Sequence, residues 1–418
     1  MADITPFRAL RYDFQSLDSK VSDRIAPPYD ILDQSDKDRL LTRSDRNIVA
    51  VDLPHVPPKS LGPPEAYESA AVILDGWTKD GTLVREQAPA FYVYHQVFEH
   101  DGRSYTRRAF FTRLRLEPFS TGSVLPHEQT FGGPKEDRLA LMKTTRTNLS
   151  PVFALYRDPN DEVALAFASS IERPPDAVGT LNNVQNRLWI VSDSAVVNRI
   201  VRAFADRKIY IADGHHRYIT ALNYRDWLAE RTKAGLSTDH PANFALLALA
   251  SMDDAGNLIL PTHRVLTDIP DVSLDQLMQT WKPGCAETSP DQADMTLFCG
   301  AGAQTKHVRF TNRAVLASLE PGMSDAWCEL DVAYLHRYLI DELFTPSISR
   351  GDTPKIRYIK TLHDAESCAR NEKGIALICK PTTMSQLRSV SEAGDLMPAK
   401  STYFYPKVVT GLVINPLE

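Results

Sequence analysis

Apolar and polar positions in the first third of the chain follow patterns that predict one long helix and a hairpin. Residues 63–83, PPEAYESAAVILDGWTKDGTL, space their apolar side chains like one face of a helix that ends at an Asp-Gly turn. Residues 89–116 contain two alternating runs joined at Asp101-Gly102, which is a strong hairpin signal. Residues 24–33, RIAPPYDILD, predict a shaped turn that opens a helix, and residues 45–54, DRNIVAVDLP, predict a short strand closed by Pro54.

The middle of the chain predicts alternating helices and strands. Residues 124–156 pass from a polar loop into a helix near Pro134 and then into an apolar strand. Residues 192–235 predict a helix, a strand through Ile211 and a second helix from about Arg217. Residues 243–266 predict a pair of strands around a turn. The predicted class is therefore α/β (α+β), with one region over 1–270 and a C-terminal α+β region over 271–418 that packs back on it.

Composition narrows the class of protein. A chain of 418 residues exceeds the size at which one core keeps growing, and 43% hydrophobic and 24% charged residues are typical of soluble globular proteins. The formal charge of -6 argues against nucleic acid as a partner, and the basic stretch 107–116, RRAFFTRLRL, is interpreted as a strand with one solvated face. No apolar run predicts a membrane partner, and the N-terminus lacks the apolar core of a signal peptide, so we expect a cytoplasmic protein. The five cysteines form no CxxC pair and are expected to be free buried thiols.

One string, DGHHR at residues 213–217, carries the clearest chemistry. Gly214 lets the backbone approach a ligand closely, and the amides that follow point out of a helix N-terminus, which suits a phosphate. Arg217 can fork onto phosphate oxygens, and His215 or His216 can donate to them. Asp213 can hold Mg²⁺ or accept a proton from an attacking hydroxyl. The alternative is that Asp213 only caps the helix and the histidines pack against neighbours.

A second polar island, HEQTFGGPKEDR, occupies residues 127–138 around a paired glycine. Glu128 is a candidate general base, with His127, Lys135 and Arg138 as candidate phosphate or substrate partners. A solvated loop is the alternative interpretation, since polar residues around Gly-Gly are also what solvent favours.

Two further islands lie towards the C-terminus. LPTHRV places His263 and Arg264 at the end of an apolar strand, and MPAKSTYFYPK places Lys400 and Lys407 among three aromatic residues. His263, Arg264 and Lys400 are taken as candidate substrate or phosphate partners. A surface strand end and ordinary aromatic packing are the alternatives.

Six motifs together resemble the prokaryotic domain-of-unknown-function family ten-fifteen. They follow one another in the same order over nearly the whole chain: APPYD, HEQTFGGPKEDRL, NLSPVFALY, IADGHHRY, LPTHRV and MPAKSTYFYPK. The resemblance implies membership of a family whose genes often lie near those of serine biosynthesis.

The DGHHR string also resembles the phosphate-binding motif of the ParB and sulfiredoxin-like fold, which includes archaeal free-serine kinases. That shorter resemblance covers residues 208–223 and implies a nucleotide-binding core in which residues 213–217 hold phosphates. No cysteine lies near the turn, which disfavours sulfiredoxin-type chemistry.

The combined expectation is a phosphotransferase or phosphohydrolase that acts on serine or O-phosphoserine. It would use ADP or ATP as co-substrate with Mg²⁺, in either the kinase or the phosphatase direction; a nucleotide-responsive binding protein without turnover is the alternative. We also expect the islands at 127–128, 213–217 and 263–264 to meet in one cleft, because strand ends gather along one edge of an open α/β sheet. The oligomeric state stays open.

Overall fold

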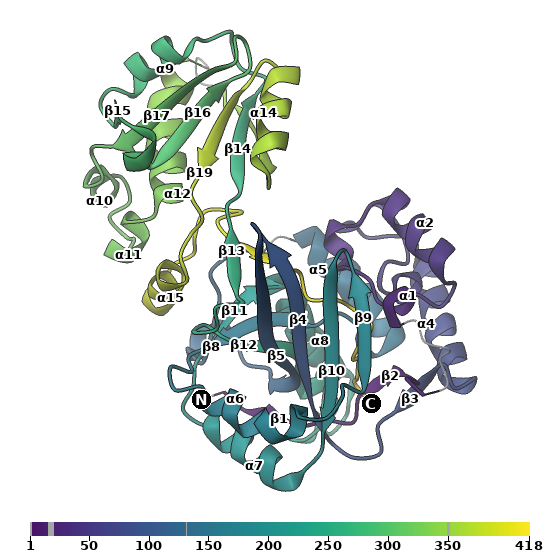
Figure 1. Cartoon of the computed structure of the whole chain (residues 1–418). Coiled ribbons are helices and arrows are strands. Elements are labelled where there is room, and N and C mark those ends of the chain that lie inside the picture. The colour runs from purple at the N-terminus through teal and green to yellow at the C-terminus, as the bar shows by residue number, and fades with distance from the viewer. Residues whose placement is uncertain (1, 16–20, 131, 349–351) are drawn as a thin grey trace. The chain divides into compact units, whose positions relative to one another are not determined.

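The computed structural model describes residues 2–15, 21–130, 132–348 and 352–418 and has a mixed α/β architecture (Figure 1). The chain forms two compact units, of which the first comprises Met1–Pro126, Thr130–Leu258 and Pro406–Glu418. The second comprises His127–Gln129 and Ile259–Tyr405. These units differ from the predicted division at residue 270, because the last thirteen residues return to the first unit and the short segment 127–129 joins the second.

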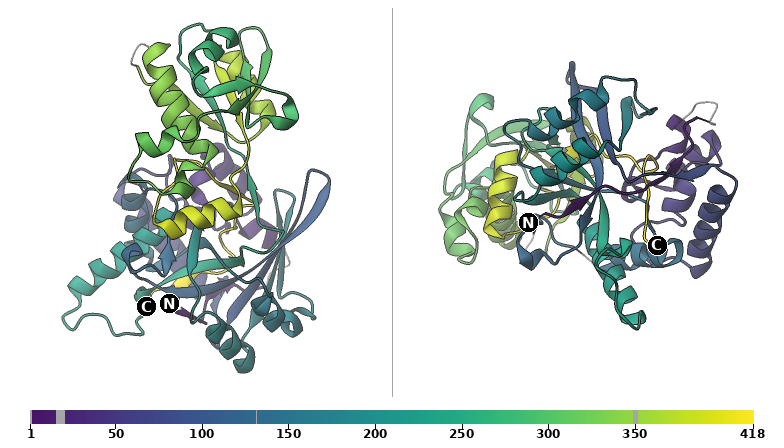
Figure 2. Two further views of the ribbon diagram at one scale, coloured as in Figure 1. Left: turned by 90° about the vertical axis from the view of Figure 1, so that its left-hand side faces the viewer. Right: turned by 90° about the horizontal axis from the view of Figure 1, so that it is seen from below.

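A nine-stranded sheet organises the first unit. Its strand order is β6-β11-β8-β12-β5-β4-β10-β9, with β1 paired to β5. The strands are β1 (Ile4–Thr5), β4 (Phe91–His100), β5 (Arg103–Arg115), β6 (Val124–Leu125), β8 (Val152–Tyr156), β9 (Ala177–Leu181), β10 (Val184–Val191), β11 (Ile209–Asp213) and β12 (Phe244–Ser251). The predicted hairpin at Asp101-Gly102 is confirmed as β4–β5, which extends past its neighbours in the sheet (Figures 1 and 2).

Eight α-helices belong to the described part of this unit, and α5, α6, α7 and α8 contribute residues to the core of the sheet. They are α1 (Val21–Arg24), α2 (Gln34–Arg43), α3 (Val49–Asp52), α4 (Pro64–Lys79), α5 (Gly132–Thr145), α6 (Glu162–Phe167), α7 (Ser194–Ala203) and α8 (His215–Arg231). Alternate residues of the strands point to one face, where Phe110, Ala154 and Ile211 pack with Val163 of α6, Ile200 of α7 and Tyr218 of α8. The opposite face carries polar side chains, which bear on the candidate site.

Two short strand pairs complete the first unit. β2 (Leu10–Tyr12) pairs with β3 (Leu83–Arg85), and β7 (Thr147–Asn148) pairs with β21 (Asn415–Pro416). The second pairing ties the end of the chain to the segment that follows α5.

The second unit contains a six-stranded sheet in the order β15-β17-β16-β19-β14-β18. Its strands are β14 (His263–Thr267), β15 (Cys285–Glu287), β16 (Met295–Cys299), β17 (Gln304–Phe310), β18 (Lys355–Ile359) and β19 (Ile375–Cys379). The helical segments are α9 (Leu274–Trp281), α10 (Val315–Leu319), α11 (Asp325–Cys328), α12 (Asp331–Ala333), the π-helix η6 (Tyr334–Phe344), α13 (Thr345–Ser347), α14 (Leu362–Asn371) and α15 (Met384–Ala393). β13 (Leu258–Leu260) pairs with β20 (Tyr403–Tyr405).

One local prediction is wrong. Residues 45–54 do not form a strand but contain helix α3, in which Val49, Val51 and Asp52 are all buried, and the side chain of Asn47 accepts from the Val49 amide. A run that is buried on every side shows no period from which helix and strand can be told apart. Residues 243–266 contain the predicted strands on either side of a turn, β12 and β13, but β12 joins the nine-stranded sheet while β13 pairs with β20.

Other predictions are confirmed with shifted boundaries. Helix α4 lies within the predicted segment, α5 begins at Gly132 and α8 begins at His215. The five cysteines are free, with Cys285 and Cys299 buried and the others half-buried.

Within the described residues, no helix combines the length and hydropathy that crossing a membrane requires.

Candidate functional site

The turn between β11 and α8 depends on Gly214. This residue has φ +95°, a conformation that side chains with a Cβ rarely adopt, and it occupies the N-cap position of the 17-residue helix α8. A Cβ at Gly214 would lie 2.8 Å from Arg217 Nε and 2.9 Å from its Cζ. The glycine is therefore needed both for the turn and for the placement of the arginine that follows it.

This double requirement gives a stability prediction. We expect Gly214→Ala to lower the free energy of unfolding by about 2–4 kcal/mol, which combines a left-handed backbone cost with displacement of Arg217. Gly235→Ala is the matched control, because Gly235 has φ +68° in the same unit and no heavy atom within 4 Å of its Cβ position. Urea titration should give the control a loss of only about 1–2 kcal/mol, and equal losses in both variants would contradict a packing role for Gly214.

Asp213 does not cap α8; two cations share its carboxylate. Lys407 Nζ donates to Asp213 Oδ2 at 2.6 Å, and Arg217 Nη2 donates to Asp213 Oδ1 at 3.3 Å. Burial raises the pKa of Asp213, but the charges of Lys407 and Arg217 outweigh that effect and hold the pKa well below its usual range. The helix-cap interpretation is thus wrong, since the N-cap residue is Gly214 and it has no side chain with which to cap.

Arg217 is built into the interior of the first unit. It is 8% exposed, and its Nη1 donates to the carbonyl oxygen of Pro151. Burial lowers the pKa of Arg217, and the negative charges of Asp213 and Asp30 more than compensate, so the pKa is raised and the side chain stays cationic. His215 is buried beside it in the first turn of α8, and His216 is half-buried.

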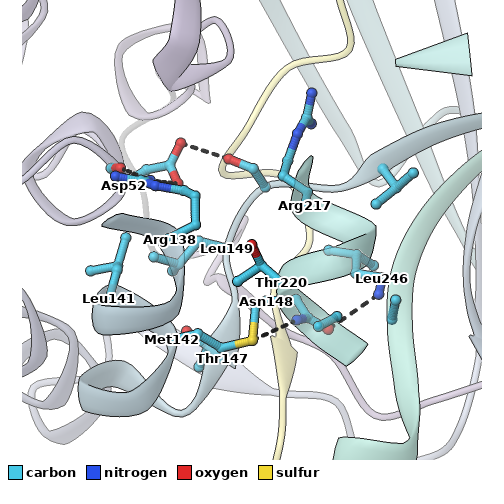
Figure 3. A pocket seen from close by; sticks show the side chains of 14 residues that line it. Asp52, Arg138, Leu141, Met142, Thr147, Asn148, Leu149, Arg217, Thr220 and Leu246 are labelled. Carbon is cyan, nitrogen blue, oxygen red and sulfur yellow. Dashed lines mark hydrogen bonds and ion pairs between the residues drawn. The ribbon is translucent and has the colours of Figure 1, made fainter. Parts of the chain in front are cut away.

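A small cavity lies beside Arg217 between α5 and α8 (Figure 3). Its volume is about 40 Å³, which is room for roughly one water molecule and not for a nucleotide. Thr220 lines it and has a buried hydroxyl without a hydrogen-bond partner among the described residues. The cavity therefore suits a buried water that supports the start of α8.

Arg138, a predicted phosphate partner, lies in a buried ion-pair cluster. Its Nη2 lies 2.8 Å from Asp137 Oδ2, and its Nη1 donates to the backbone oxygen of Asp52 at 2.6 Å (Figure 3 shows Arg138 beside Asp52). Its guanidinium also lies 3.8 Å from the ring centroid of Tyr29. These contacts favour a structural role for Arg138, while Lys135 is half-buried in the first turn of α5.

Four other predicted residues lie near one another in the second unit. Lys400 N donates to Glu128 Oε1 at 3.3 Å, and Arg264 Nη2 donates to the Lys400 carbonyl at 3.2 Å. His127 is fully buried, and its Nε2 lies 2.8 Å from Thr402 Oγ1. The islands at 127–128, 264 and 400 are thus joined within this unit.

His263 and Arg264 point to opposite faces of β14, as alternation in a strand requires. His263 Nδ1 accepts from the Cys379 amide at 3.3 Å, and burial together with the charge of Arg264 lowers its pKa. Arg264 Nε lies 3.2 Å from His336 Nε2, and burial and that positive charge lower the pKa of His336 to about 3. The structure places 213–217 in the first unit and 127–128 and 263–264 in the second, so the single cleft stays a prediction.

The described side chains around Asp213 do not form a set of ligands for a Mg²⁺ ion. Both carboxylate oxygens of Asp213 already accept from cations, and the described residues contain no group of three His, Cys, Asp or Glu side chains arranged to hold a metal. Mg²⁺ usually binds through one or two carboxylates together with substrate phosphates.

A larger, mainly apolar cavity of the first unit lies elsewhere. It has a volume of about 250 Å³ and is lined by Phe110, Tyr156, residues of α6 and His95. Burial and the charge of Arg108 lower the pKa of His95 to about 4, so this histidine is neutral at neutral pH. None of the predicted site residues lines this cavity.

The sequence did not identify two basic residues, Lys407 and Arg107, as candidates for the site. Lys400 was chosen over Lys407 in the C-terminal island, whereas the structure pairs Lys407 with Asp213. The stretch 107–116 was interpreted as a solvated strand face, but Arg107 is 0% exposed. For Lys407 the sequence offered one local sign of a special position, because the residue directly follows the proline that ends the aromatic run. For Arg107 the sequence offered none, because nothing local distinguishes this buried arginine from the exposed Arg108.

Comparison with solved structures gives only distant neighbours. A conserved hypothetical protein from Pyrococcus furiosus is 11% identical, with a TM-score of 0.32 over 73% of this chain and 95% of the other. A free serine kinase mutant in complex with ADP is 11% identical, with a TM-score of 0.35 over 73% and 92%. SbnI from Staphylococcus aureus, truncated at its C-terminus, is 10% identical, with a TM-score of 0.36 over 73% and 87%.

No curated protein matches the chain. The model of the family described as "Protein of unknown function (DUF1015)" matches residues 4–333. The match spans well over half of the sequence and includes the turn at Gly214. The chain belongs to the DUF1015 family.

Proposed function

We propose that the chain binds a nucleotide by its phosphates at the DGHHR turn and transfers a phosphoryl group to or from a small hydroxylated metabolite, most simply serine or O-phosphoserine. The observation that carries the proposal is the pair of cations, Lys407 and Arg217, held on one carboxylate at the start of a 17-residue helix. Helix starts and paired cations both favour phosphate groups. The ParB and sulfiredoxin-like core remains part of this proposal.

Asp213 acts as a positioning residue in this scheme. Its pKa is held low by Lys407 and Arg217, and a carboxylate with a low pKa is a weak base at neutral pH. Its charge instead fixes the directions of the ammonium and the guanidinium. His215 and His216, in the first turn of the helix, would donate to phosphate oxygens.

The proton acceptor is then a different group, and we assign that role to Glu128. In the kinase direction the serine hydroxyl oxygen attacks the terminal phosphorus of the nucleotide, and the bond from that phosphorus to the bridging oxygen breaks. The hydroxyl proton passes to the Glu128 carboxylate, and ADP leaves as AMP, or ATP as ADP. His127, His263, Arg264 and Lys400 would bind substrate, with Lys135 as a further phosphate partner.

The proposal is tested by incubating the whole chain with Mg²⁺, serine and either ADP or ATP, and separately with O-phosphoserine and AMP or water. Phosphorus NMR should show transfer in at least one direction. Saturable nucleotide binding without any product would identify a nucleotide-responsive binding protein instead. Absence of nucleotide binding would contradict the phosphate site.

Lys407 gives a direct binding prediction. We expect Lys407→Met to weaken ADP binding by about 10- to 150-fold, since a hydrogen bond to a charged group contributes roughly 1.5–3 kcal/mol. Lys79→Met is the control, because Lys79 is exposed at the end of α4. Titration calorimetry should show an unchanged affinity only for the control, and an unchanged affinity for Lys407→Met would remove Lys407 from the site.

A further inference from the structure

Arg107 is a charged residue buried in the first unit without a full set of partners. It lies in β5 and is 0% exposed. Its Nη2 donates to Gln96 Oε1, whereas its Nε and Nη1 are buried with no hydrogen-bond partner in the described structure. Two donors of a cationic group are thus left unsatisfied in the interior.

No carboxylate among the described residues lies within ion-pair distance of Arg107. Its guanidinium lies 4.5 Å from the ring centroid of Phe153, which compensates the charge only in part. Burial lowers the pKa of Arg107 to about 10, with the charges of Tyr94, Asp254 and Asp213 opposing that effect. The side chain is therefore still cationic at neutral pH, and a buried cation without an anion is strongly unfavourable.

Two contacts of Arg107, with Phe153 and with Gln96, connect it to the DGHHR turn. Phe153, the ring beside the guanidinium, is the cross-strand partner of Asp213 in the β8–β11 pairing. Gln96, which accepts from Arg107, donates through Nε2 to the Lys407 carbonyl at 3.0 Å. Arg107 is therefore joined on one side to the strand that ends at Asp213 and on the other to the residue that pairs with it.

We infer that Arg107 is a third cation of the phosphate site at Asp213, and that its two unsatisfied donors bind an oxyanion of the phosphate class. The inference rests on one part of the proposed function, namely that an anion binds at this turn. Arg107, Arg217 and Lys407 carry three positive charges against the one negative charge of Asp213, so these four side chains have a net charge of +2. A phosphate monoester at neutral pH carries about -1.5 to -2 and would bring negative charge to these cations.

The sign of the stability change separates this role from a structural one. A buried cation without an anion is unfavourable, so its replacement by an apolar side chain of similar volume removes that cost, whereas removing one partner of a buried ion pair destabilises the protein. We expect Arg107→Met without ligand to unfold at the same urea concentration as the wild type or at a higher one. We expect the same variant to bind inorganic phosphate and ADP at least about tenfold more weakly.

Arg113→Met is the matched control for this experiment. Arg113 lies in the same strand, has a buried Nε without a partner among the described residues, and places its guanidinium 4.8 Å from the Phe244 ring centroid. Asp213 is not among the charges that shift its pKa. Its replacement should leave the affinities for both inorganic phosphate and ADP unchanged.

The affinities are measured by titration calorimetry on the whole chain, with inorganic phosphate and ADP as separate probes. Weakening of both in Arg107→Met shows contact with a phosphate group, whereas weakening of ADP alone places that contact at the nucleotide. Unchanged affinity for both, with Lys407→Met weakened, overturns the inference and leaves the proposed function standing. Failure of the wild type to bind either probe contradicts both.

A second variant covers the case in which Arg107→Met does not fold. Arg107→Lys keeps the positive charge but replaces the planar fork of donors by a single ammonium. We expect it to fold and to bind both probes at least about threefold more weakly. Wild-type affinity in Arg107→Lys, when Arg107→Met is unfolded, would show that the arginine is structural and would overturn the inference.

Discussion

Glu128→Gln is expected to lower the rate of phosphoryl transfer by about 10²- to 10⁴-fold while leaving the affinity for ADP unchanged. Glutamine keeps an oxygen that accepts from the Lys400 amide, as Glu128 Oε1 does at 3.3 Å. It cannot take up the hydroxyl proton at neutral pH. The substitution therefore removes the base and preserves the local hydrogen bond.

Steady-state rates and ADP titrations on the same preparation check this result. Glu366→Gln is the control, because Glu366 is in the second unit and forms an exposed i,i+4 pair with Arg370 at 2.9 Å. Its rate should match the wild type. A rate for Glu128→Gln within about threefold of the wild type, against the effect expected of a general base, would show that another group accepts the proton.

Arg138→Met is expected to lower the free energy of unfolding by about 3–5 kcal/mol, which is the usual result of breaking a buried ion pair. Arg138 contacts both Asp137 and Asp52, and all three side chains are nearly inaccessible to solvent. Burial raises the pKa of Asp52, and the charge of Arg138 opposes that increase. Without the guanidinium, Asp52 and Asp137 would both lose their buried cationic partner, which leaves negative charge in the interior incompletely compensated.

Arg146→Met is the matched control, since Arg146 follows the same helix and pairs with Glu418 at 2.7 Å on the surface. An exposed pair of this kind contributes about 0–1 kcal/mol. Urea titration of both variants measures the difference. Equal losses would mean that the Arg138 cluster contributes no more than a surface pair.

The elements around the DGHHR turn were predictable because their signals are local. The β4–β5 hairpin follows from Asp101-Gly102 between two alternating runs, and α8 follows from the apolar spacing after Ile211. Gly214 was predicted to let the backbone approach a ligand; the structure gives it a φ of +95° at the start of α8, and the approach to a ligand stays a prediction. Each of these features depends on residues within a few positions of one another.

Arg107 and Lys407 could not be assigned from the sequence because their environments come from distant segments. A charged residue in an alternating strand normally faces solvent, but the segment that contains Lys407 covers this face of the sheet. The contact between Gln96 and the Lys407 carbonyl spans 311 positions of the sequence. Helix α3 was mistaken for a strand for a related reason, since packing rather than propensity decides a short run that is buried on every side.

Comparison of ADP with adenosine tests whether the turn at residues 213–217 recognises phosphate groups. Both are titrated into the wild-type chain by calorimetry at one salt concentration. If Lys407 and Arg217 bind phosphate, ADP should bind at least about 100-fold more tightly than adenosine, because two charge-assisted hydrogen bonds are lost with the phosphates. Equal affinities for ADP and adenosine, or no binding of ADP at all, would show that the turn does not bind phosphate.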